Sequence, residues 1–128
     1  MRIVVIGAGA VGGVIAAYLS NETYQVELVC KHKEIVEAIE NNGLRVEGIR
    51  GRIITYPDAV IDISQITDKP DIVFIATKYQ DAKAAAEAVL PFLQDDTMVV
   101  SLQNGMCEEV IAEVVGEART VGCIVEWG

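Results

Sequence analysis

The stretch that decides the fold is RIVVIGAGAVGG, residues 2–13. Its first half, residues 2–6, is rich in β-branched residues, and such an apolar run is typical of a parallel strand buried on both faces. Glycines follow at Gly7, Gly9 and Gly12, and the mostly apolar residues 14–19 after them predict a helix. The chain is therefore predicted to start with a strand, a glycine-rich turn and a helix.

This GxGxxG spacing, placed between a strand and a helix, indicates a turn that binds the pyrophosphate of a dinucleotide. Gly7 permits the tight turn, Gly9 lets the backbone approach the pyrophosphate, and Gly12 lets the helix pack closely on the strand. The N–H groups and the dipole at the start of the helix also favour an anion. The alternative is a glycine-rich turn that only packs a helix against a sheet.

Strands and helices alternate along most of the remaining chain. Further strands are predicted at residues 25–30, 71–76, 97–102 and 120–125, and further helices at 34–40, 80–93 and 108–115. The second helix should stop at Asn41-Asn42-Gly43, because glycine adopts a left-handed conformation at little cost.

Residues 44–56 break this alternation. They suggest two short strands around Gly48-Ile49-Arg50-Gly51, closed by Tyr56-Pro57-Asp58, and hence a small hairpin. We expect one dinucleotide-binding domain, residues 1–128, of the α/β class. Its architecture should be a doubly wound, mostly parallel sheet of the Rossmann type, with a hairpin insertion near residues 44–56.

The composition excludes several classes of function. A net charge of −9 argues against nucleic acid and anionic membranes as partners, because both would repel the protein. The three cysteines lack the spacing of metal ligands and the chain has a single His, so we expect no metal site and free thiols. We find neither a signal peptide nor a membrane span, and we expect a cytoplasmic protein.

The end of the second strand indicates which cofactor binds. NAD-binding folds usually carry an acidic residue there, which accepts a hydrogen bond from the ribose 2′-hydroxyl. This strand instead runs into Lys31-His32-Lys33, where a cation would attract a 2′-phosphate. We therefore predict NADP(H), with Lys31 as the first contact. The alternatives are a solvated charge cluster, or Glu27 acting as a ribose acceptor from inside the strand.

Polar residues also follow the later strands. Ligands of open parallel sheets bind at the carboxyl ends of the strands, which selects Thr77-Lys78, Gln103-Asn104-Gly105 and Gly128. Lys78 could donate to a phosphate or to a substrate carboxylate, and Asn104 could both donate and accept. The alternatives are a surface charge for Lys78 and a simple turn for Asn104-Gly105.

Taken together, these residues resemble the ketopantoate reductases (2-dehydropantoate 2-reductases). Members share the Gly-Ala-Gly-Ala-Val-Gly turn, a basic residue after the second strand, a strand ending in Thr/Val-Lys, and a Gln-Asn-Gly segment. The matching positions are residues 7–12, Lys31, Ala76-Thr77-Lys78, Gln103-Asn104-Gly105-Met106, Val115-Gly116 and Val121-Gly122. They run in order along essentially the whole chain.

The resemblance implies hydride transfer from NADPH to the ketone of a 2-oxo acid such as 2-dehydropantoate, in pantothenate and coenzyme A synthesis. It implies that Lys78 contacts the cofactor, that Asn104 lies where nicotinamide and substrate meet, and that Gly128 contacts the cofactor through its backbone. It also implies a helical second domain, absent from this chain, that supplies the proton-donating Lys and most substrate contacts. We therefore expect no catalytic residue here, and a fragment that binds NADP(H) without turnover.

Two residues depart from the family pattern. Lys31 replaces the usual Arg and loses its bidentate fork, so cofactor choice is expected to relax. Cys107 replaces a common Gly at a helix start, where a reactive thiol is one conceivable role. The candidate cofactor-binding residues are Gly7, Ala8, Gly9, Ala10, Val11, Gly12, Lys31, Lys78, Asn104 and Gly128, with Asn104 also the candidate substrate-binding residue.

Two other functions stay open at this point. One is a nucleotide-sensing module without catalysis, although such modules usually carry an acidic residue after the second strand. The other is a different β-hydroxyacid dehydrogenase. The sequence does not fix which 2-oxo acid is reduced or the oligomeric state, although an exposed sheet edge favours a homo-oligomer.

Overall fold

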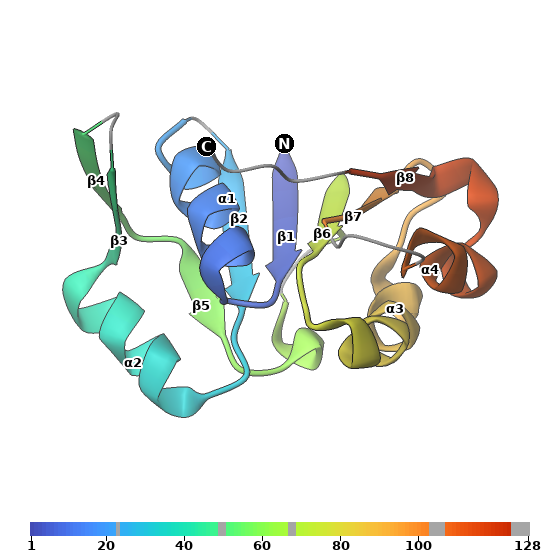
Figure 1. Cartoon of the computed structure of the whole chain (residues 1–128), viewed down its shortest axis with the longest axis horizontal. Helices are drawn as coiled ribbons and strands as arrows, with labels where there is room; N and C mark the ends of the chain where they lie inside the picture. Colours follow the sequence, from blue (N-terminus) through green and yellow to red (C-terminus); the bar gives the residue numbers. More distant parts are fainter. Residues whose placement is uncertain (23, 49–50, 67–68, 103–106, 124–128) are drawn as a thin grey trace.

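The computed structural model of the chain describes residues 1–22, 24–48, 51–66, 69–102 and 107–123 (Figure 1). Its main sheet has six strands in the order β5-β2-β1-β6-β7-β8, and every pairing in it is parallel. The strands are β1 (Arg2–Ile6), β2 (Gln25–Val29), β5 (Asp58–Val60), β6 (Ile72–Ile75), β7 (Met98–Ser101) and β8 (Thr120–Gly122). The predicted doubly wound sheet of the Rossmann type is confirmed.

Strand β1 is the centre of the sheet, and its side chains divide the core into two layers. Ile3 and Val5 pack on one face with Leu28 of β2, whereas Val4 and Ile6 pack on the other face. All four β1 side chains are almost fully buried, and each such Val or Ile contributes about 1.5–3 kcal/mol. Burial on both faces explains why the strand is apolar without alternation.

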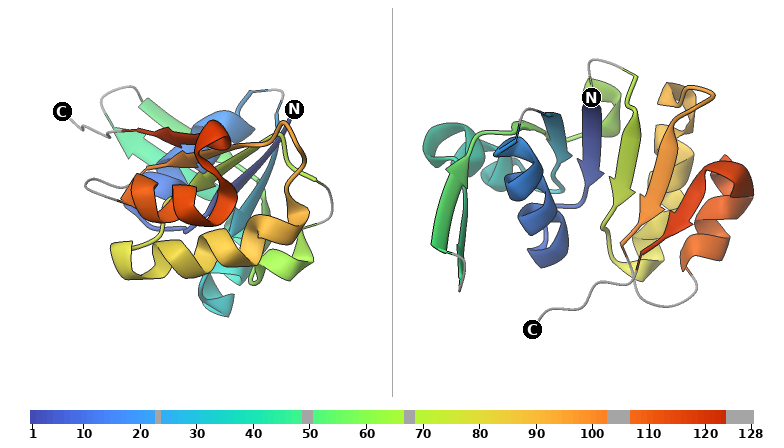
Figure 2. Two further views of the ribbon diagram at one scale, coloured as in Figure 1. Left: turned by 90° about the vertical axis from the view of Figure 1, so that its right-hand side faces the viewer. Right: turned by 90° about the horizontal axis from the view of Figure 1, so that it is seen from above.

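Helices cover both faces of the sheet (Figures 1 and 2). Helices α1 (Ala10–Ser20) and α2 (Lys33–Asn42) contribute to the layer of Ile3 and Val5, and α3 (Ala82–Val89) and α4 (Cys107–Val115) to the layer of Val4 and Ile6. Helix α2 ends at Gly43, which has a φ of 80°, as the sequence predicts.

The predicted helix at 80–93 is divided in three. Helix α3 lies between two 3₁₀ turns, η2 (Tyr79–Asp81) and η3 (Leu90–Phe92). Pro91 lies in the second turn, and a proline supplies no N–H for a continuing helix. Because only three residues separate η2 from the end of β6, η2 stays at the carboxyl edge of the sheet.

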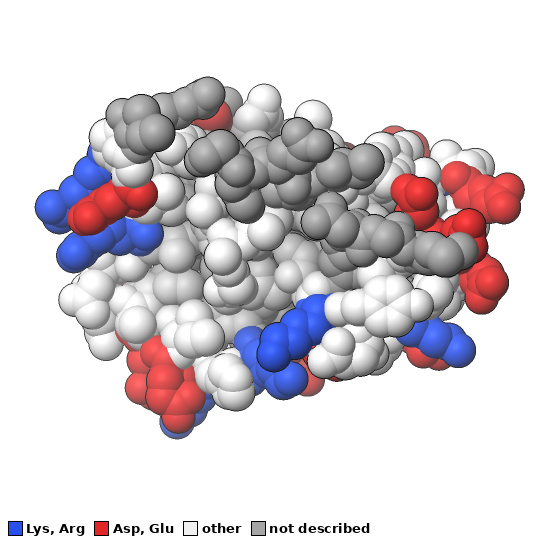
Figure 3. All heavy atoms as spheres, in the orientation of Figure 1, with Lys and Arg blue, Asp and Glu red and all other residues white. Residues whose placement is uncertain are grey.

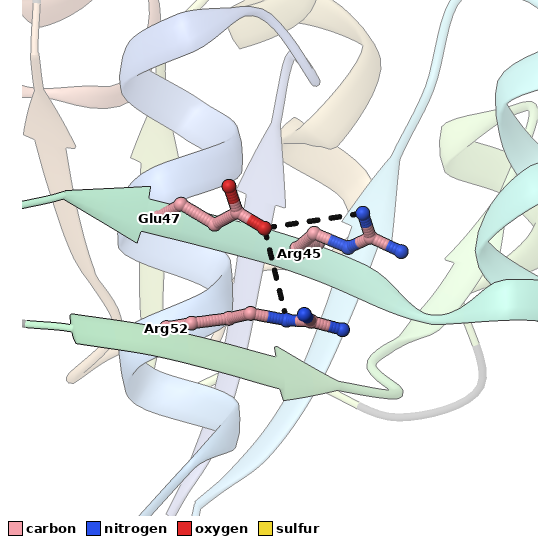
Figure 4. Close-up of polar contacts among 3 residues, drawn as sticks. All are labelled: Arg45, Glu47 and Arg52. Atoms are coloured by element: carbon pink, nitrogen blue, oxygen red, sulfur yellow. Dashed lines mark ion pairs between the residues drawn. The ribbon is translucent and has the colours of Figure 1, made fainter.

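The hairpin is confirmed as β3 (Leu44–Gly48) and β4 (Gly51–Thr55), antiparallel and set outside the main sheet beside α1 (Figure 1). The Glu47 carboxylate lies between Arg45, at 3.9 Å, and Arg52, at 3.7 Å (Figure 4). These side chains are more than half exposed, so the ion pairs add little stability.

Strand β5 was not predicted. The sequence analysis gave Tyr56-Pro57-Asp58 only the closing of the hairpin, yet Asp58 starts a three-residue strand that pairs with β2. Three residues are too few to show a periodicity, and only the exposed edge of β2 selects this pairing. The strand extends the carboxyl edge of the sheet, where the Cys30 N–H donates to the Val60 carbonyl at 2.8 Å.

The described residues contain neither a candidate membrane span nor a candidate metal-binding cluster. Within them, no helix combines the length and the apolar character needed to cross a bilayer. No cluster of three or more His, Cys, Asp or Glu side chains in these ranges has an arrangement that could hold a metal ion.

Gly12→Ala should destabilise the fold, because the new Cβ would fall on the backbone carbonyl of Gly7. We expect a loss of about 2 kcal/mol or more in the free energy of unfolding, measured by urea denaturation, since backbone cannot move aside as a side chain can. The matched control is Gly9→Ala, whose Cβ would meet no atom within 4 Å in the part of the chain that the structure describes. It should change stability by less than about 1 kcal/mol. Equal losses in the two variants would contradict this account of the turn.

Candidate functional site

The ends of β1, β2 and β6 meet at the carboxyl edge of the sheet. Backbone hydrogen bonds hold the turn after β1 between its neighbours: the Gly7 N–H donates to the Val29 carbonyl at 3.0 Å, and the Ala76 N–H donates to the Ile6 carbonyl at 2.8 Å. The chain leaves β1 toward β2 on one side, whereas β6 lies on the other. This is the switch point at which open α/β sheets bind ligands.

Gly7 is required by its conformation and by its neighbour. Its φ of 109° is one that L side chains rarely adopt, and a Cβ there would lie 2.7 Å from the Ala76 carbonyl oxygen. Gly12 has the complementary role: a Cβ added there would fall on the Gly7 carbonyl and lie 3.1 Å from the Ala76 Cβ, so its absence lets α1 approach both. The two glycines together set α1 directly against the ends of β1 and β6.

Gly9 differs from both. It is the N-cap of α1, its carbonyl accepts the Gly13 N–H at 2.8 Å, and no side chain caps the helix. The first turn of α1 has no acidic residue. Because a Cβ on Gly9 would meet no atom of the described residues within 4 Å, the space above it is open as far as they extend. The first N–H groups of a helix lack intrahelical partners, so this end of α1 suits an anion.

A hollow of about 300 Å³ opens beside this turn. Its lining residues are Gly7, Ala8, Gly9, Lys31, His32, Ile35, Ala76, Thr77, Lys78 and Asp81. The structure thus brings five of the sequence-predicted residues together, namely Gly7, Ala8, Gly9, Lys31 and Lys78. The end of β2 and the end of β6 each place one lysine at the rim.

The other predicted residues lie elsewhere. Ala10 lines a neighbouring hollow of about 470 Å³ between the turn and β3. Val11 is half-buried in the first turn of α1, and Gly12 is buried. Asn104 and Gly128, with the rest of the Gln103-Asn104-Gly105-Met106 segment, lie outside the described residues.

The basic cluster after β2 does not act as one unit. Lys33 pairs with Glu37 on its own helix, with Nζ and Oε1 3.8 Å apart, whereas Lys31 and His32 line the hollow. His32 is the N-cap of α2. Glu27, the alternative ribose acceptor, lines a different hollow near the amino ends of β1, β2 and β5. The charge cluster therefore divides, and its first two residues face the glycine-rich turn.

Asp81 is a residue that the sequence analysis missed. Its Oδ2 lies 3.9 Å from Lys31 Nζ, and the Lys31 and Asp81 side chains are 78% and 45% exposed. Asp81 ends η2, three residues after Lys78. The sequence does show a carboxylate three residues after Lys78. Its position opposite Lys31, however, depends on the 3₁₀ turn that replaces the predicted start of the helix.

A second hollow, of about 320 Å³, adjoins the first and was also missed. The two share Gly7, Lys31, Thr77 and Asp81. Its remaining lining is mostly apolar and comes from strand ends, η1 (Ile63–Gln65) and α3: Ile6, Val29, Cys30, Ile61, Asp62, Ile63, Ala84, Ala85 and Ala88. This hollow depends on β5 and on the turn after it, which the sequence did not reveal.

Asp62 belongs to the turn rather than to the hollow's chemistry. Its carboxylate accepts a hydrogen bond from the Ser64 N–H at 2.9 Å, which lowers the pKa of Asp62 below its usual value. The Asp62 N–H in turn donates to Gln65 Oε1 at 3.1 Å, which completes a capping box. The capping box fixes the backbone after β5, and with it the apolar wall of the second hollow.

The excess negative charge gathers away from the glycine-rich turn. Figure 3 shows a group of acidic side chains at the α4 end of the molecule and others at the opposite end, where basic side chains lie beside them. The acidic residues of α4 and the turn after it are Glu108, Glu109, Glu113 and Glu117. The local charge at the turn is set instead by Lys31, Lys78 and Asp81.

Two of the three thiols are inert. None of the three cysteines forms a disulfide bond, and only Cys123 is exposed. Burial raises the pKa of Cys30 to about 11 and raises the pKa of Cys107 as well. Cys107 starts α4 but is fully buried, which argues against the reactive thiol considered for it.

Comparison with known proteins bears on this arrangement. The family model for ketopantoate reductase PanE/ApbA matches residues 3–128. The chain belongs to the ketopantoate reductase family. A 2-dehydropantoate 2-reductase of Pyrococcus horikoshii is 35% identical over 130 residues, covering 100% of this chain and 40% of the relative.

Solved structures agree with this ketopantoate reductase assignment. The 2-dehydropantoate 2-reductase of Geobacter metallireducens GS-15 superposes with a TM-score of 0.84 at 29% identity, over 95% of this chain and 40% of that one. A ternary structure of D-mandelate dehydrogenase with NADH and anilino(oxo)acetate gives a TM-score of 0.82 at 25% identity, over 94% and 39% of the two chains. The chain thus spans about 40% of the length of its relatives.

We expect one fast-reacting thiol in the native chain. With a disulfide reagent at about pH 8, Cys123 should react quickly, whereas Cys30 and Cys107 should react only after denaturation, because they are buried and protonated. Cys123→Ser should remove the fast reaction while leaving two thiols titratable in urea. Fast labelling of more than one thiol in the native protein would show that the core around Cys30 or Cys107 is open.

Proposed function

We propose that this chain is the NADP(H)-binding part of a 2-oxo acid reductase, with 2-dehydropantoate as its substrate. The observation that carries the proposal is the hollow that joins the open end of α1 at Gly9 to Lys31 and Lys78. The family assignment supports the reaction class, because the similar protein of Pyrococcus horikoshii, which contains this domain, is a 2-dehydropantoate 2-reductase. When bound, NADPH would supply the hydride for the ketone of the substrate.

The pyrophosphate would lie over Gly9. The open space above Gly9 is the volume that a side chain would otherwise fill, and the uncapped start of α1 offers N–H donors and a partial positive charge. The lack of an acidic residue in the first turn removes the repulsion that a bound phosphate would meet. Gly7, Ala8, Gly9, Ala10, Val11 and Gly12 are thus the proposed pyrophosphate-binding residues.

Lys31 and Lys78 would bind the two ends of the cofactor. Lys31 follows β2 and would attract the 2′-phosphate of the adenosine ribose, where an acidic residue would repel it. Lys78 follows β6, beyond the switch point, and would contact the cofactor toward the nicotinamide. Asn104 and Gly128 stay proposed contacts because they follow predicted strands at the carboxyl edge and match the family pattern; both lie outside the described residues.

The proton donor would come from another part of the enzyme. Reduction of a ketone needs a proton at the carbonyl oxygen as well as a hydride. The relatives are about two and a half times as long as the region that this chain matches, and we propose that their remaining, helical domain holds the donor and most substrate contacts. On this proposal the chain alone binds cofactor and turns over no substrate.

A second candidate is an NADH-dependent dehydrogenase of 2-hydroxy acids. Two observations favour it: the D-mandelate dehydrogenase was solved with NADH, and Asp81 sets a carboxylate opposite Lys31. The two candidates share the pyrophosphate site and differ in the 2′ substituent of the ribose. A sensor without catalysis has no specific observation in its favour.

The test is calorimetric titration of the chain with NADPH and, separately, with NADH. Lys31→Glu should weaken NADPH binding at least about tenfold, because it replaces an attraction to the 2′-phosphate with a repulsion. Lys33→Glu is the matched control, with the same charge change on a side chain that pairs with Glu37 instead of facing the hollow. It should weaken binding less than about threefold. Equal effects of the two variants would remove the role given to Lys31.

Gly9→Ala should separate binding from folding. Its Cβ would occupy the space proposed for the pyrophosphate without contacting any described atom, so affinity for both NADPH and NADH should fall about tenfold or more while stability falls by less than about 1 kcal/mol. Calorimetry and thermal melting on one preparation give both results. Unchanged affinity would mean that the glycine-rich turn serves only the packing of α1.

A further inference from the structure

The ion pair of Lys31 and Asp81 joins two separate parts of the carboxyl edge. Lys31 follows β2, and Asp81 ends the turn after β6, so the pair spans the groove beside the glycine-rich turn. Both residues line the 300 Å³ hollow at Gly9 and also the 320 Å³ apolar hollow. The pair therefore stands where the two hollows join.

A dinucleotide bound as proposed would have to pass this pair. With its pyrophosphate at Gly9, the flat, weakly polar adenine fits the apolar hollow lined by Ile61, Ile63 and Ala85. The ribose that connects them then lies beside Lys31 and Asp81. The 2′ position of that ribose is where the chemistry of NADH and NADPH differs.

We propose that Asp81 is a specificity-determining residue, which reads the 2′ position together with Lys31. This inference rests on the proposed function. A 2′-phosphate is attracted by Lys31 and repelled by Asp81, so NADPH must separate the pair. A 2′-hydroxyl can donate a hydrogen bond to the Asp81 carboxylate, so NADH leaves the pair intact.

The carboxylate thus reaches the ribose from an unusual direction. NAD-binding folds usually carry it at the end of the second strand, where this chain has Lys31. Here the acidic residue comes from across the groove, three residues after Lys78. The site combines a cation for the phosphate with an acceptor for the hydroxyl, and it is built to accept both cofactors.

The geometry of the pair allows either partner to be released. At 3.9 Å the two charges attract each other without a direct hydrogen bond. Both side chains are substantially exposed, so water screens the attraction and can solvate either group. Asp62, the other carboxylate lining the apolar hollow among the described residues, caps its own turn through Ser64. Asp81 is therefore the acceptor available to the ribose.

The test is Asp81→Asn, titrated with NADPH and NADH by calorimetry. The ratio of NADPH affinity to NADH affinity should rise about tenfold, because removing one negative charge about 4 Å from a phosphate in water is worth about fivefold and NADH loses its acceptor. The gain in NADPH binding should shrink at high salt. Asp96→Asn is the matched control: it removes the same charge from an exposed residue before β7, at the opposite edge of the sheet, and should leave the ratio unchanged.

The outcomes separate the two proposals. If wild type binds neither nucleotide, both the proposed function and this inference are overturned. If wild type binds and Asp81→Asn leaves the ratio unchanged, or changes it no more than Asp96→Asn does, the role of Asp81 is overturned and the NADP(H) site stands. Thermal melts of the Asp81→Asn and Asp96→Asn proteins should lie close to the wild type, because both replacements are isosteric, Asp96 is exposed and the Asp81 side chain is 45% exposed.

Discussion

The close approach of α1 to the ends of β1 and β6 is the constraint on which the rest of the structure depends. It exists because Gly12 has no side chain where it meets the Gly7 carbonyl, and because Gly7 adopts a φ of 109° beside Ala76. Once α1 is set there, its uncapped start faces the switch point, and the residues that follow β2 and β6 lie around it. The packing of α1 at Gly7 and Gly12 thus fixes the position of this helix in the core and beside the groove.

The two glycine contacts and the open Gly9 divide stability from binding within six residues. Gly7 and Gly12 have backbone atoms where a Cβ would be, so their replacement acts on the fold. At Gly9 no described atom lies within 4 Å of that position, so on the proposed function its replacement acts on the bound cofactor. The motif therefore meets two independent requirements: Gly7 and Gly12 are needed for packing inside the protein, and Gly9 for the proposed binding of a ligand.

Long-range and local electrostatics act in opposite directions on an anionic ligand. The net charge of −9 repels a dinucleotide, but beyond about 10 Å this repulsion is screened at ordinary salt, and the acidic residues of α4 lie at one end of the molecule. At the groove itself the charges that matter are few. Two lysines and one aspartate line the hollow, so a single substitution changes its local balance.

Most of the fold could be predicted from the sequence. So could the part of the site that depends on residues close together in the chain. The sequence reveals strands β1 and β6 and the glycine-rich turn. Each is determined by the burial or the backbone conformation of its own residues. Strand β5 was missed because three residues carry no periodicity, and the apolar hollow was missed with it. Asp81 was missed because its neighbour Lys31 is 50 positions away, and only the pairing order of β2, β1 and β6 brings them together. Asn104 and Gly128 rest on sequence resemblance, since they lie outside the described residues.

The strands of the main sheet are shorter at its edges than at its centre, which bears on how readily the protein would aggregate in concentrated solution. The central strand β1 is five residues long, whereas the outermost strands β5 and β8 have three residues each. An edge strand exposes N–H and C=O groups that another chain could extend, and short edges limit this templating. The strands with long apolar runs are enclosed between neighbours, and each outer edge of the main sheet offers only three residues to a pairing strand, so a homo-oligomer formed through these edges would have a short ladder. The fold therefore keeps its most aggregation-prone segments away from its own borders.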